Sequence, residues 1–211
     1  MSVELRSFNF ELRADRSEEH GHFINGRPIV FGETYDNGWF TESIAPGALD
    51  KTDLRDVRFL VNHNTDMIPL ARSRNNNANS TMQMSPDDDG MTIRVDLDTE
   101  RNAEALSLYS AVERGDISGM SFMFRIDSDK WTDLDSEHPH RTITGISKVF
   151  EVSAVTWPAY EQTSLEARSH AKALDSAASV LESAREMRRR ELEREDRIQQ
   201  TLRKLEENRD V

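Results

Sequence analysis

The sequence predicts a mainly β (α+β) fold, a barrel or sandwich decorated by helices and followed by a charged helical tail. Three observations lead to this class. Short runs of alternating apolar and polar residues recur through the body, separated by turn residues. A helical period is clear only near Ala105–Val112. Ser169 to Leu205 is dominated by Arg, Glu, Ala and Leu, without proline or glycine. We therefore expect a domain over residues 1–167 and a tail over residues 168–211.

The N-terminal elements are expected to be short strands joined by glycine turns. Residues 8–12 alternate apolar and polar side chains, which predicts a half-buried strand. Asn25-Gly26 stands between apolar flanks and predicts a type I′ hairpin. Residues 36–38 (Asp-Asn-Gly) mark another turn, residues 39–44 form a further strand, and Pro46-Gly47 ends it.

The middle of the chain is expected to contain two more strands. Residues 57–61 form a compact apolar strand that continues toward His63. Residues 72–86 are rich in Asn, Ser and Met and are expected to be a loop. After an Asp-Asp-Asp-Gly turn, residues 91–97 alternate cleanly and predict a strand.

A helix is predicted between a cap at Asp98 or Thr99 and a stop at Gly115. Its apolar face has the spacing i, i+3, i+4, i+7 and consists of Ala105, Leu108, Tyr109 and Val112. The body then closes with four segments: a strand that carries Ser121, a polar loop over 127–140, and strands near 142–146 and 149–156.

The tail is expected to be a solvated helix. Glu186/Arg190 and Glu193/Arg197 are i, i+4 pairs of opposite charge. Only Ile198, Leu202 and Leu205 form a heptad-like seam, and residues 188–196 hold too few apolar side chains to extend it. This favours a solvated helix over a long coiled coil.

Composition excludes several classes of function. The net charge is −12 and resides in the body, because the tail nearly balances its charges. An acidic body argues against direct binding of nucleic acid. The chain has no cysteine, which excludes disulfides, thiol catalysis and thiolate metal sites. It begins without a signal-peptide pattern and has no apolar run of membrane-spanning length, so we expect a soluble protein with no membrane partner.

Ser121 is the first candidate for chemistry. Its strand places Met120, Phe122 and Phe124 on one face and Ser121 on the other, so a solvent-facing serine is the ordinary explanation. Gly119 nearby would let a substrate approach the backbone closely. Ser118, three residues earlier, is a rival nucleophile that the pattern does not exclude.

His63 and Glu151 are the matching candidates for a base and an acid. His63 follows Phe59 and Val61 at alternate positions and is expected on the same strand face, which is typical of either a buried structural histidine or a general base. Asn64 beside it could orient the ring or bind a substrate backbone. Glu151 falls inside an apolar strand, where a carboxylate is costly unless paired. Exposure on an edge strand and pairing with a histidine both remain open.

Metal catalysis is a weak alternative. His20-Gly-His22 and His138-Pro-His140 are His-x-His pairs with an acidic residue nearby, but both lie in turn-rich sequence that would not fix ligand geometry. No glycine-rich phosphate loop or dinucleotide fingerprint is present. We therefore expect no metal and no cofactor.

Five segments in order resemble the HK97-type phage prohead (capsid maturation) proteases, over about residues 20–165. They are Gly26-Arg-Pro-Ile-Val-Phe-Gly, Gly38-Trp-Phe-Thr-Glu-Ser-Ile-Ala-Pro-Gly-Ala48, Val61-Asn-His-Asn64, Gly115-Asp-Ile-Ser-Gly-Met-Ser-Phe122 and Glu151-Val-Ser-Ala-Val-Thr-Trp-Pro-Ala159. Each segment alone is unspecific, and their order makes the resemblance strong. It implies a fold like that of the herpesvirus assemblin protease, a closed or partly open β-barrel wrapped by helices.

The resemblance also implies roles for single residues. His63 matches the catalytic histidine, Ser121 the nucleophile and Glu151 the third member. Ser118 falls where the family varies. The substrate and oxyanion neighbourhood would comprise Asn64, Gly119, Met120, Phe122 and Met123, with backbone N–H groups near Gly119 or the Arg72 turn facing the oxyanion. Two positions depart from the family pattern: Met123 replaces a frequent small residue, and Ala71 stands where Leu-Gly-Arg is common.

By the same resemblance, the protein would be a serine endopeptidase in the host cytoplasm, inside the immature capsid. Its substrates would be the scaffolding segment of the major capsid protein and the protease itself, and a homo-oligomer is left open. The charged tail could dock on scaffold helices or be removed by self-cleavage. The alternative is a non-enzymatic assembly protein that retains a protease-like body.

Overall fold

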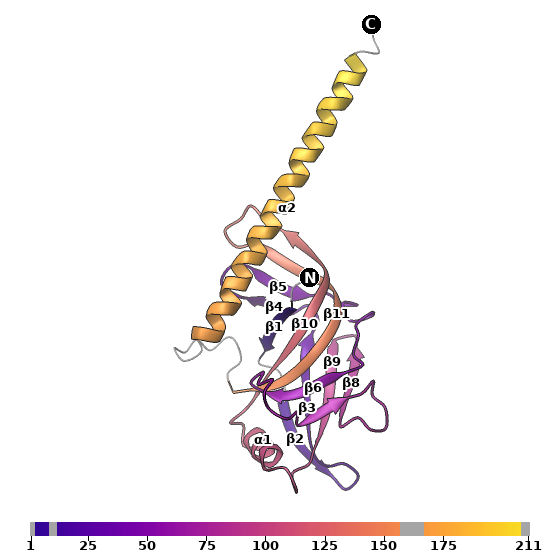
Figure 1. The fold of residues 1–211 in the computed structure, drawn as a ribbon, viewed down its shortest axis with the longest axis vertical. Helices are drawn as coiled ribbons and strands as arrows, with labels where there is room; N and C mark the ends of the chain where they lie inside the picture. The colour runs from indigo at the N-terminus through magenta and orange to yellow at the C-terminus, as the bar shows by residue number, and fades with distance from the viewer. Residues whose placement is uncertain (1–2, 9–11, 157–166, 208–211) are drawn as a thin grey trace.

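The structure is a computed structural model that describes residues 3–8, 12–156 and 167–207. Figure 1 shows a β-rich body from which one long helix extends. The elements in chain order are β1 (Val3–Phe8), β2 (Leu12–Ser17), β3 (Gly21–Val30), β4 (Thr34–Asp36), β5 (Thr41–Ile44), β6 (Val57–Val61), β7 (Ala71–Ser73), β8 (Met82–Asp87), β9 (Gly90–Leu97), α1 (Ala103–Glu113), β10 (Gly119–Thr132), β11 (His140–Val155) and α2 (Ala167–Glu207).

The described strands form two sheets. The larger sheet has the order β1-β10-β11-β5-β4, with β6 paired to β11 and β7 to β6, and the smaller has the order β2-β3-β9-β8. The long β11 pairs with β5 through His140–Ile143 and with β6 through Glu151–Ala154, so the larger sheet forks. Strand pairing within the described residues does not close a barrel. The protein is mainly β with two helices, and the closed form of the expected barrel is wrong.

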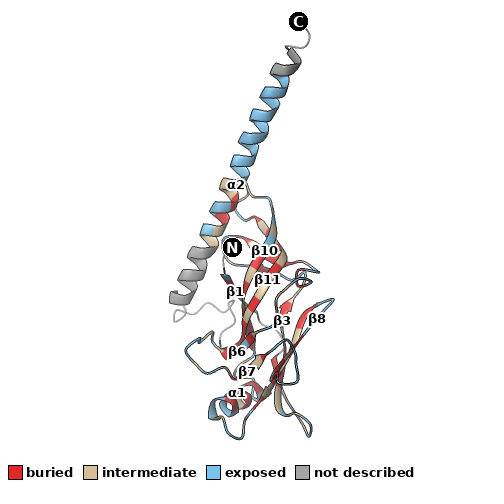
Figure 2. Ribbon diagram, turned by 45° about the vertical axis from the view of Figure 1, so that its right-hand side comes forward, coloured by how far each residue is buried: buried red, intermediate tan, exposed pale blue. Residues whose placement is uncertain are grey.

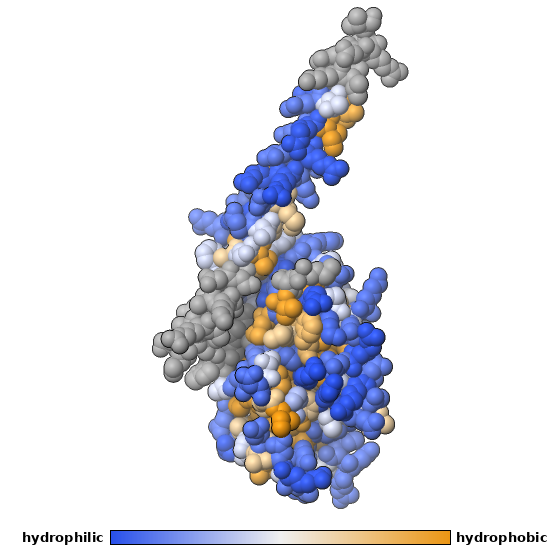
Figure 3. All heavy atoms as spheres, viewed as in Figure 1, coloured by the Kyte–Doolittle hydropathy of each residue, from blue (hydrophilic) through white to orange (hydrophobic). Residues whose placement is uncertain are grey.

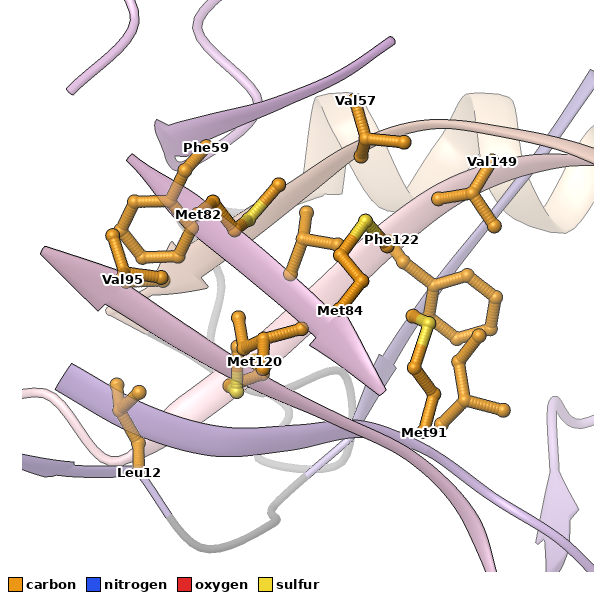
Figure 4. Packing of buried hydrophobic residues seen from close by; sticks show 14 of the residues in the cluster. Leu12, Val57, Phe59, Met82, Met84, Met91, Val95, Met120, Phe122 and Val149 are labelled. Atoms are coloured by element: carbon orange, nitrogen blue, oxygen red, sulfur yellow. The ribbon is translucent and has the colours of Figure 1, made fainter. Parts of the chain in front are cut away.

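One hydrophobic core joins both sheets (Figure 4). Alternation along β10 directs Met120, Phe122 and Phe124 into it, all fully buried, as the sequence predicts. Met82 and Met84 of β8 and Met91 of β9 enter from the smaller sheet. The same alternation turns Ser121 to the opposite face of β10.

Helix α1 buries the four residues predicted for its apolar face: Ala105, Leu108, Tyr109 and Val112. Its cap differs from the prediction. The side chain of Asn102 accepts hydrogen bonds from the backbone N–H groups of Glu104 and Ala105, whereas Asp98 accepts from Arg101 one turn earlier. Gly115 follows the C-cap with φ +78°, as expected of a helix stop.

Two other turn and loop predictions are wrong. Asn25-Gly26 lies inside β3, because β2 and β9 pair with it on both sides and the Asn25 amide donates to Asp15 at 2.9 Å. The hairpin turn falls instead just before Gly21, whose φ is +64°. The expected loop over 72–86 contains the end of β7 and nearly all of β8.

The C-terminal part of the body has fewer breaks than predicted. Strand β10 continues to Thr132, into the expected polar loop. The two strands expected near 142–146 and 149–156 are one strand, β11. Register shifts between Met123 and Asp129 show how the long pair bends without breaking.

The expected helical tail is α2, and the domain boundary at residue 167 stays a prediction. The helix contacts the body where Arg185 donates to the carbonyl oxygens of Leu134 and Ser136 at 3.0 and 2.8 Å. Leu181 and Ala184 are buried there, and most described residues beyond them are exposed and hydrophilic (Figures 2 and 3). Neither helix, over its described residues, is long and apolar enough to span a membrane.

A buried group of charges, the β1 ion cluster (Glu4, Arg6, Glu42 and Arg141), attaches β1 to the larger sheet. Arg141 donates to Glu4 at 2.9 Å and to Glu42 at 3.1 Å, and Arg6 bonds both carboxylates. Burial raises the pKa of Glu4, but Arg6 and Arg141 outweigh burial and hold the pKa below its ordinary value. Glu4 is therefore ionised and paired at neutral pH.

Glu4→Gln is expected to lower stability by about 2 kcal/mol at neutral pH, since it removes charge-assisted hydrogen bonds. Because the folded-state pKa of Glu4 is depressed, its stabilisation is complete above the ordinary value of 4.5 and is lost as the pH falls through the lowered value. The difference in melting temperature between wild type and variant should therefore shrink on acidification below 4.5. An undiminished difference in acid would contradict this assignment.

Candidate active site

His63 lies in a tight turn immediately after β6. Asn62 and His63 both have left-handed backbones, with φ of 51° and 54°. This conformation is uncommon for residues with a side chain and marks a site that its surroundings hold in place. The prediction that His63 lies on the same face as the apolar residues of β6 is therefore wrong, because the left-handed backbone at Asn62 ends the extended strand before His63.

The end of β11 holds this turn. The Asn62 N–H donates to the Ala154 carbonyl at 2.9 Å, and the Asn62 side chain exchanges hydrogen bonds with Thr156. The His63 N–H donates to Ser153 Oγ at 3.2 Å. The imidazole thus has a fixed position relative to β11.

Glu151 pairs with His63. Its Oε1 lies 2.5 Å from His63 Nδ1, and its Oε2 accepts a 2.6 Å hydrogen bond from Ser153 Oγ. Glu151 is only 3% exposed, because its strand is flanked by β6 and β10. Of the two explanations left open by the sequence, pairing with histidine is correct and exposure on an edge strand is wrong.

The other ring nitrogen of His63, Nε2, is buried and has no hydrogen-bond partner within the described residues. Burying a polar nitrogen without a partner is costly, and such atoms concentrate where a site awaits a ligand or a moving group. The carboxylate at Nδ1 fixes the ring so that Nε2 is the nitrogen available for proton transfer.

Ser121 is adjacent to this group through the sheet. It is the register partner of Ser153 across β10 and β11 and of Ser7 across β1 and β10. The side chain is fully buried, so a solvent-facing serine is the wrong interpretation. Its Oγ donates a 2.7 Å hydrogen bond to the carbonyl oxygen of Arg6 in β1.

The rival serine has a different environment. Ser118 is exposed and precedes β10. Strand pairing begins at Gly119, so Ser118 has no register partner on β11 that would place it beside Glu151 or Ser153. Geometry therefore separates two serines that the sequence pattern could not separate.

The remaining predicted neighbours lie in different environments. Met120 and Phe122 are core residues, and Gly119 and Met123 occupy the same strand, with Met123 opposite Glu151. Asn64 is exposed, and its Oδ1 accepts from the Asp66 N–H, so its side chain closes the turn. The Arg72 N–H donates to Thr81 Oγ1, which commits that donor elsewhere.

The His-x-His pairs do not assemble a metal centre in the described part of the chain, where His, Asp and Glu form no group of three suited to an ion. His22 Nδ1 lies 2.6 Å from Thr99 Oγ1, and His140 bonds Thr41 and Ser43. Their partners are hydroxyl groups, which position the rings within the sheets.

The family model described as caudovirus prohead serine protease matches residues 8–176, well over half of the chain. The chain belongs to this family. The protein is thus a serine protease of phage capsid maturation by family. It is 26% identical over 182 residues to the prohead protease of Enterobacteria phage HK97, with 84% of this chain and 74% of that protein covered.

A solved structure, the capsid assembly protease of bacteriophage T4, is similar in part. It has a TM-score of 0.39 and 15% sequence identity and covers 73% of this chain and 99% of its own. The description of the candidate site in this chain rests on its own geometry.

Ser153 is the site residue that sequence reasoning did not single out. It contacts both Glu151 and the His63 backbone and lies opposite Ser121. The signal for it was its position two residues after Glu151, on the same face of an alternating strand. Asn62 gave a weaker signal, because asparagine tolerates left-handed backbones.

Proposed function

We propose that Ser121, His63 and Glu151 are the nucleophile, general base and orienting acid of this prohead protease. The hydrogen-bonded chain from Glu151 through His63 Nδ1, with Nε2 left available, carries the proposal. This is the acid and base arrangement that serine acyl transfer requires: a base held in one tautomer by a carboxylate, with its other nitrogen able to take a proton. Ser121 lies in register opposite Ser153, which bonds that carboxylate.

In the reaction, Ser121 Oγ attacks a peptide carbonyl and His63 Nε2 takes its proton. The imidazolium, stabilised by Glu151, then delivers that proton to the leaving amine, and water hydrolyses the acyl-enzyme by the reverse sequence. Backbone N–H groups near Gly119 are the proposed oxyanion donors. Met123, opposite Glu151, would limit the size of the substrate side chain that can approach.

We further propose that the substrates are the scaffolding segment of the major capsid protein and the protease itself, cut inside the immature capsid. Family membership supports this. Co-expression with the capsid protein should yield shortened capsid protein and shortened protease by intact mass. The Ser121→Ala form should leave both at full length. Full processing by that variant would refute the proposal.

Ser153 is proposed to position the acid and the base. Ser153→Ala removes a hydrogen bond to the Glu151 carboxylate and one from the His63 turn, and we expect kcat to fall about 10- to 100-fold with little change in KM. Ser147→Ala is the matched control, because Ser147 lies on the same strand and its hydroxyl donates to the Arg125 carbonyl rather than to Glu151 or His63. Equal kinetics for the two variants would contradict the assigned role.

The part of α2 that projects beyond its contact with the body is proposed to dock on scaffold helices. A chain ended after Arg189 keeps the buried residues Leu181 and Ala184 and the bonds of Arg185. We expect it to cleave peptides at the wild-type rate and to enter capsids several-fold less, by an amount that depends on salt. The number of protease copies per purified prohead, compared between wild type and the shortened chain, measures this effect. Equal incorporation of the two would contradict the proposed role of α2.

A further inference from the structure

Strand β1 covers the proposed nucleophile. It is the edge strand of the larger sheet and pairs antiparallel with β10, with Ser7 opposite Ser121. The hydroxyl of Ser121 donates to the Arg6 carbonyl of β1 and is fully buried. While β1 is seated, a peptide from outside cannot reach Ser121 Oγ.

In this arrangement the hydroxyl proton of Ser121 is not hydrogen-bonded to His63. A working pair needs the serine hydroxyl to donate to the histidine base. Here the hydroxyl donates to a backbone carbonyl of β1, and His63 Nε2 is buried without a partner in the described residues. The structure is therefore a resting form of the site.

The β1 ion cluster keeps β1 in place. Its arginines and glutamates span β1, β5 and β11, and Glu42 and Arg141 are 1% and 4% exposed. The outward side chains Val3 and Leu5 are 48% and 36% exposed, so they contribute little burial. The ion pairs on one side of β1 therefore contribute much of the stability of its attachment to the sheet. Removing one partner of a buried ion pair is strongly destabilising, because the other charge is left uncompensated.

We infer that the edge of β10 beneath β1 is the substrate site, and that an extended polypeptide segment pairs antiparallel with β10 there after β1 is displaced. The inference rests on the proposed function. The Arg6 carbonyl lies 2.7 Å from Ser121 Oγ, so a strand in a similar register brings its own carbonyl to the distance of about 3–3.5 Å that attack requires. Backbone pairing supplies affinity, as in other proteins that bind peptides by adding a strand.

A reversible lock on β1 tests this in the full chain. The chain has no cysteine, so Val3→Cys with Arg125→Cys, at paired positions of β1 and β10, introduces the only thiols. We expect Ser121 of the oxidised form to react with a fluorophosphonate at least about tenfold more slowly than that of the reduced form. The single variant Arg125→Cys, treated identically, should not respond to oxidation.

Weakening the β1 ion cluster should have the opposite effect. Glu42→Gln removes one carboxylate that binds Arg6 and Arg141, and we expect about tenfold faster labelling of Ser121. Asp87→Asn is the matched control, because it breaks the exposed ion pair with Arg27 in the other sheet. A synthetic Val-Glu-Leu-Arg-Ser-Phe peptide, the sequence of β1, should slow labelling of Glu42→Gln, and a scrambled peptide should not.

The outcomes separate the two ideas. Equal labelling of Ser121 in the oxidised and reduced forms, or no competition by the β1 peptide, overturns the inference and leaves the proposed function standing. Absence of Ser121 labelling in every form, including folded Glu42→Gln, overturns the proposed function and the inference with it. A labelling rate set by β1 supports both.

Discussion

Ser121→Ala is expected to abolish peptide-bond hydrolysis, with kcat reduced about 10⁶-fold. The reason is that no other described hydroxyl group occupies its register position opposite Ser153 on the sheet face that also carries Glu151. Cleavage of a scaffold peptide, followed by mass spectrometry, measures this loss. The fold should survive, because loss of the buried hydrogen bond to the Arg6 carbonyl costs about 1 kcal/mol.

Ser118→Ala is the matched control for the nucleophile. Ser118 is three residues away, exposed, and outside the strand pairing, so its loss should leave kcat within about twofold of wild type. Retained hydrolysis by Ser121→Ala together with its loss in Ser118→Ala would reverse the assignment of the two serines.

Loss of the base is expected to be as severe as loss of the nucleophile. His63→Ala removes the nitrogen that accepts the Ser121 proton, and we expect a reduction of kcat of about 10⁶-fold. Glu151→Gln keeps the shape of the side chain but removes the carboxylate charge that holds the tautomer of His63 through Nδ1. We expect a reduction of kcat of about 10⁴-fold. The same peptide assay measures both.

The three residues should also behave as one unit. The double variant Ser121→Ala with His63→Ala is expected to be no slower than either single variant, because each alone already removes the concerted step. His138→Ala is the control histidine, since His138 contacts Asp36 at 3.0 Å and lies outside the site. Additive losses in the double variant would show that Ser121 and His63 act independently.

The periodicity of apolar residues correctly predicted which apolar side chains of α1 and β10 are buried. The buried face of α1 and the core-facing residues of β10 followed from periods of 3.6 and 2. Asn25-Gly26 misled because strand partners from 12 to 17 and from 90 to 97 kept β3 extended, and a turn signal cannot anticipate such distant pairing. Met82 and Met84 are buried by β9 in the same way, within a segment whose composition resembles a loop.

The residue types of the proposed site were predictable from the sequence, but their assembly in space was not. His63, Ser121 and Glu151 come from a turn, β10 and β11, and only sheet register brings the last two together. The left-handed turn at Asn62 and His63 leaves no signature in alternation, so His63 was assigned to a strand face. The covering of Ser121 by β1 depends on a pairing 115 residues apart in sequence, which no local pattern contains.

The most direct test of the central claim is the position of a fluorophosphonate adduct, found by peptide mass mapping of the folded Glu42→Gln protein. The account predicts one adduct, on Ser121, that disappears in the Ser121→Ala form and persists in the Ser118→Ala form. An adduct on Ser118 or any other residue, or none at all, would contradict it.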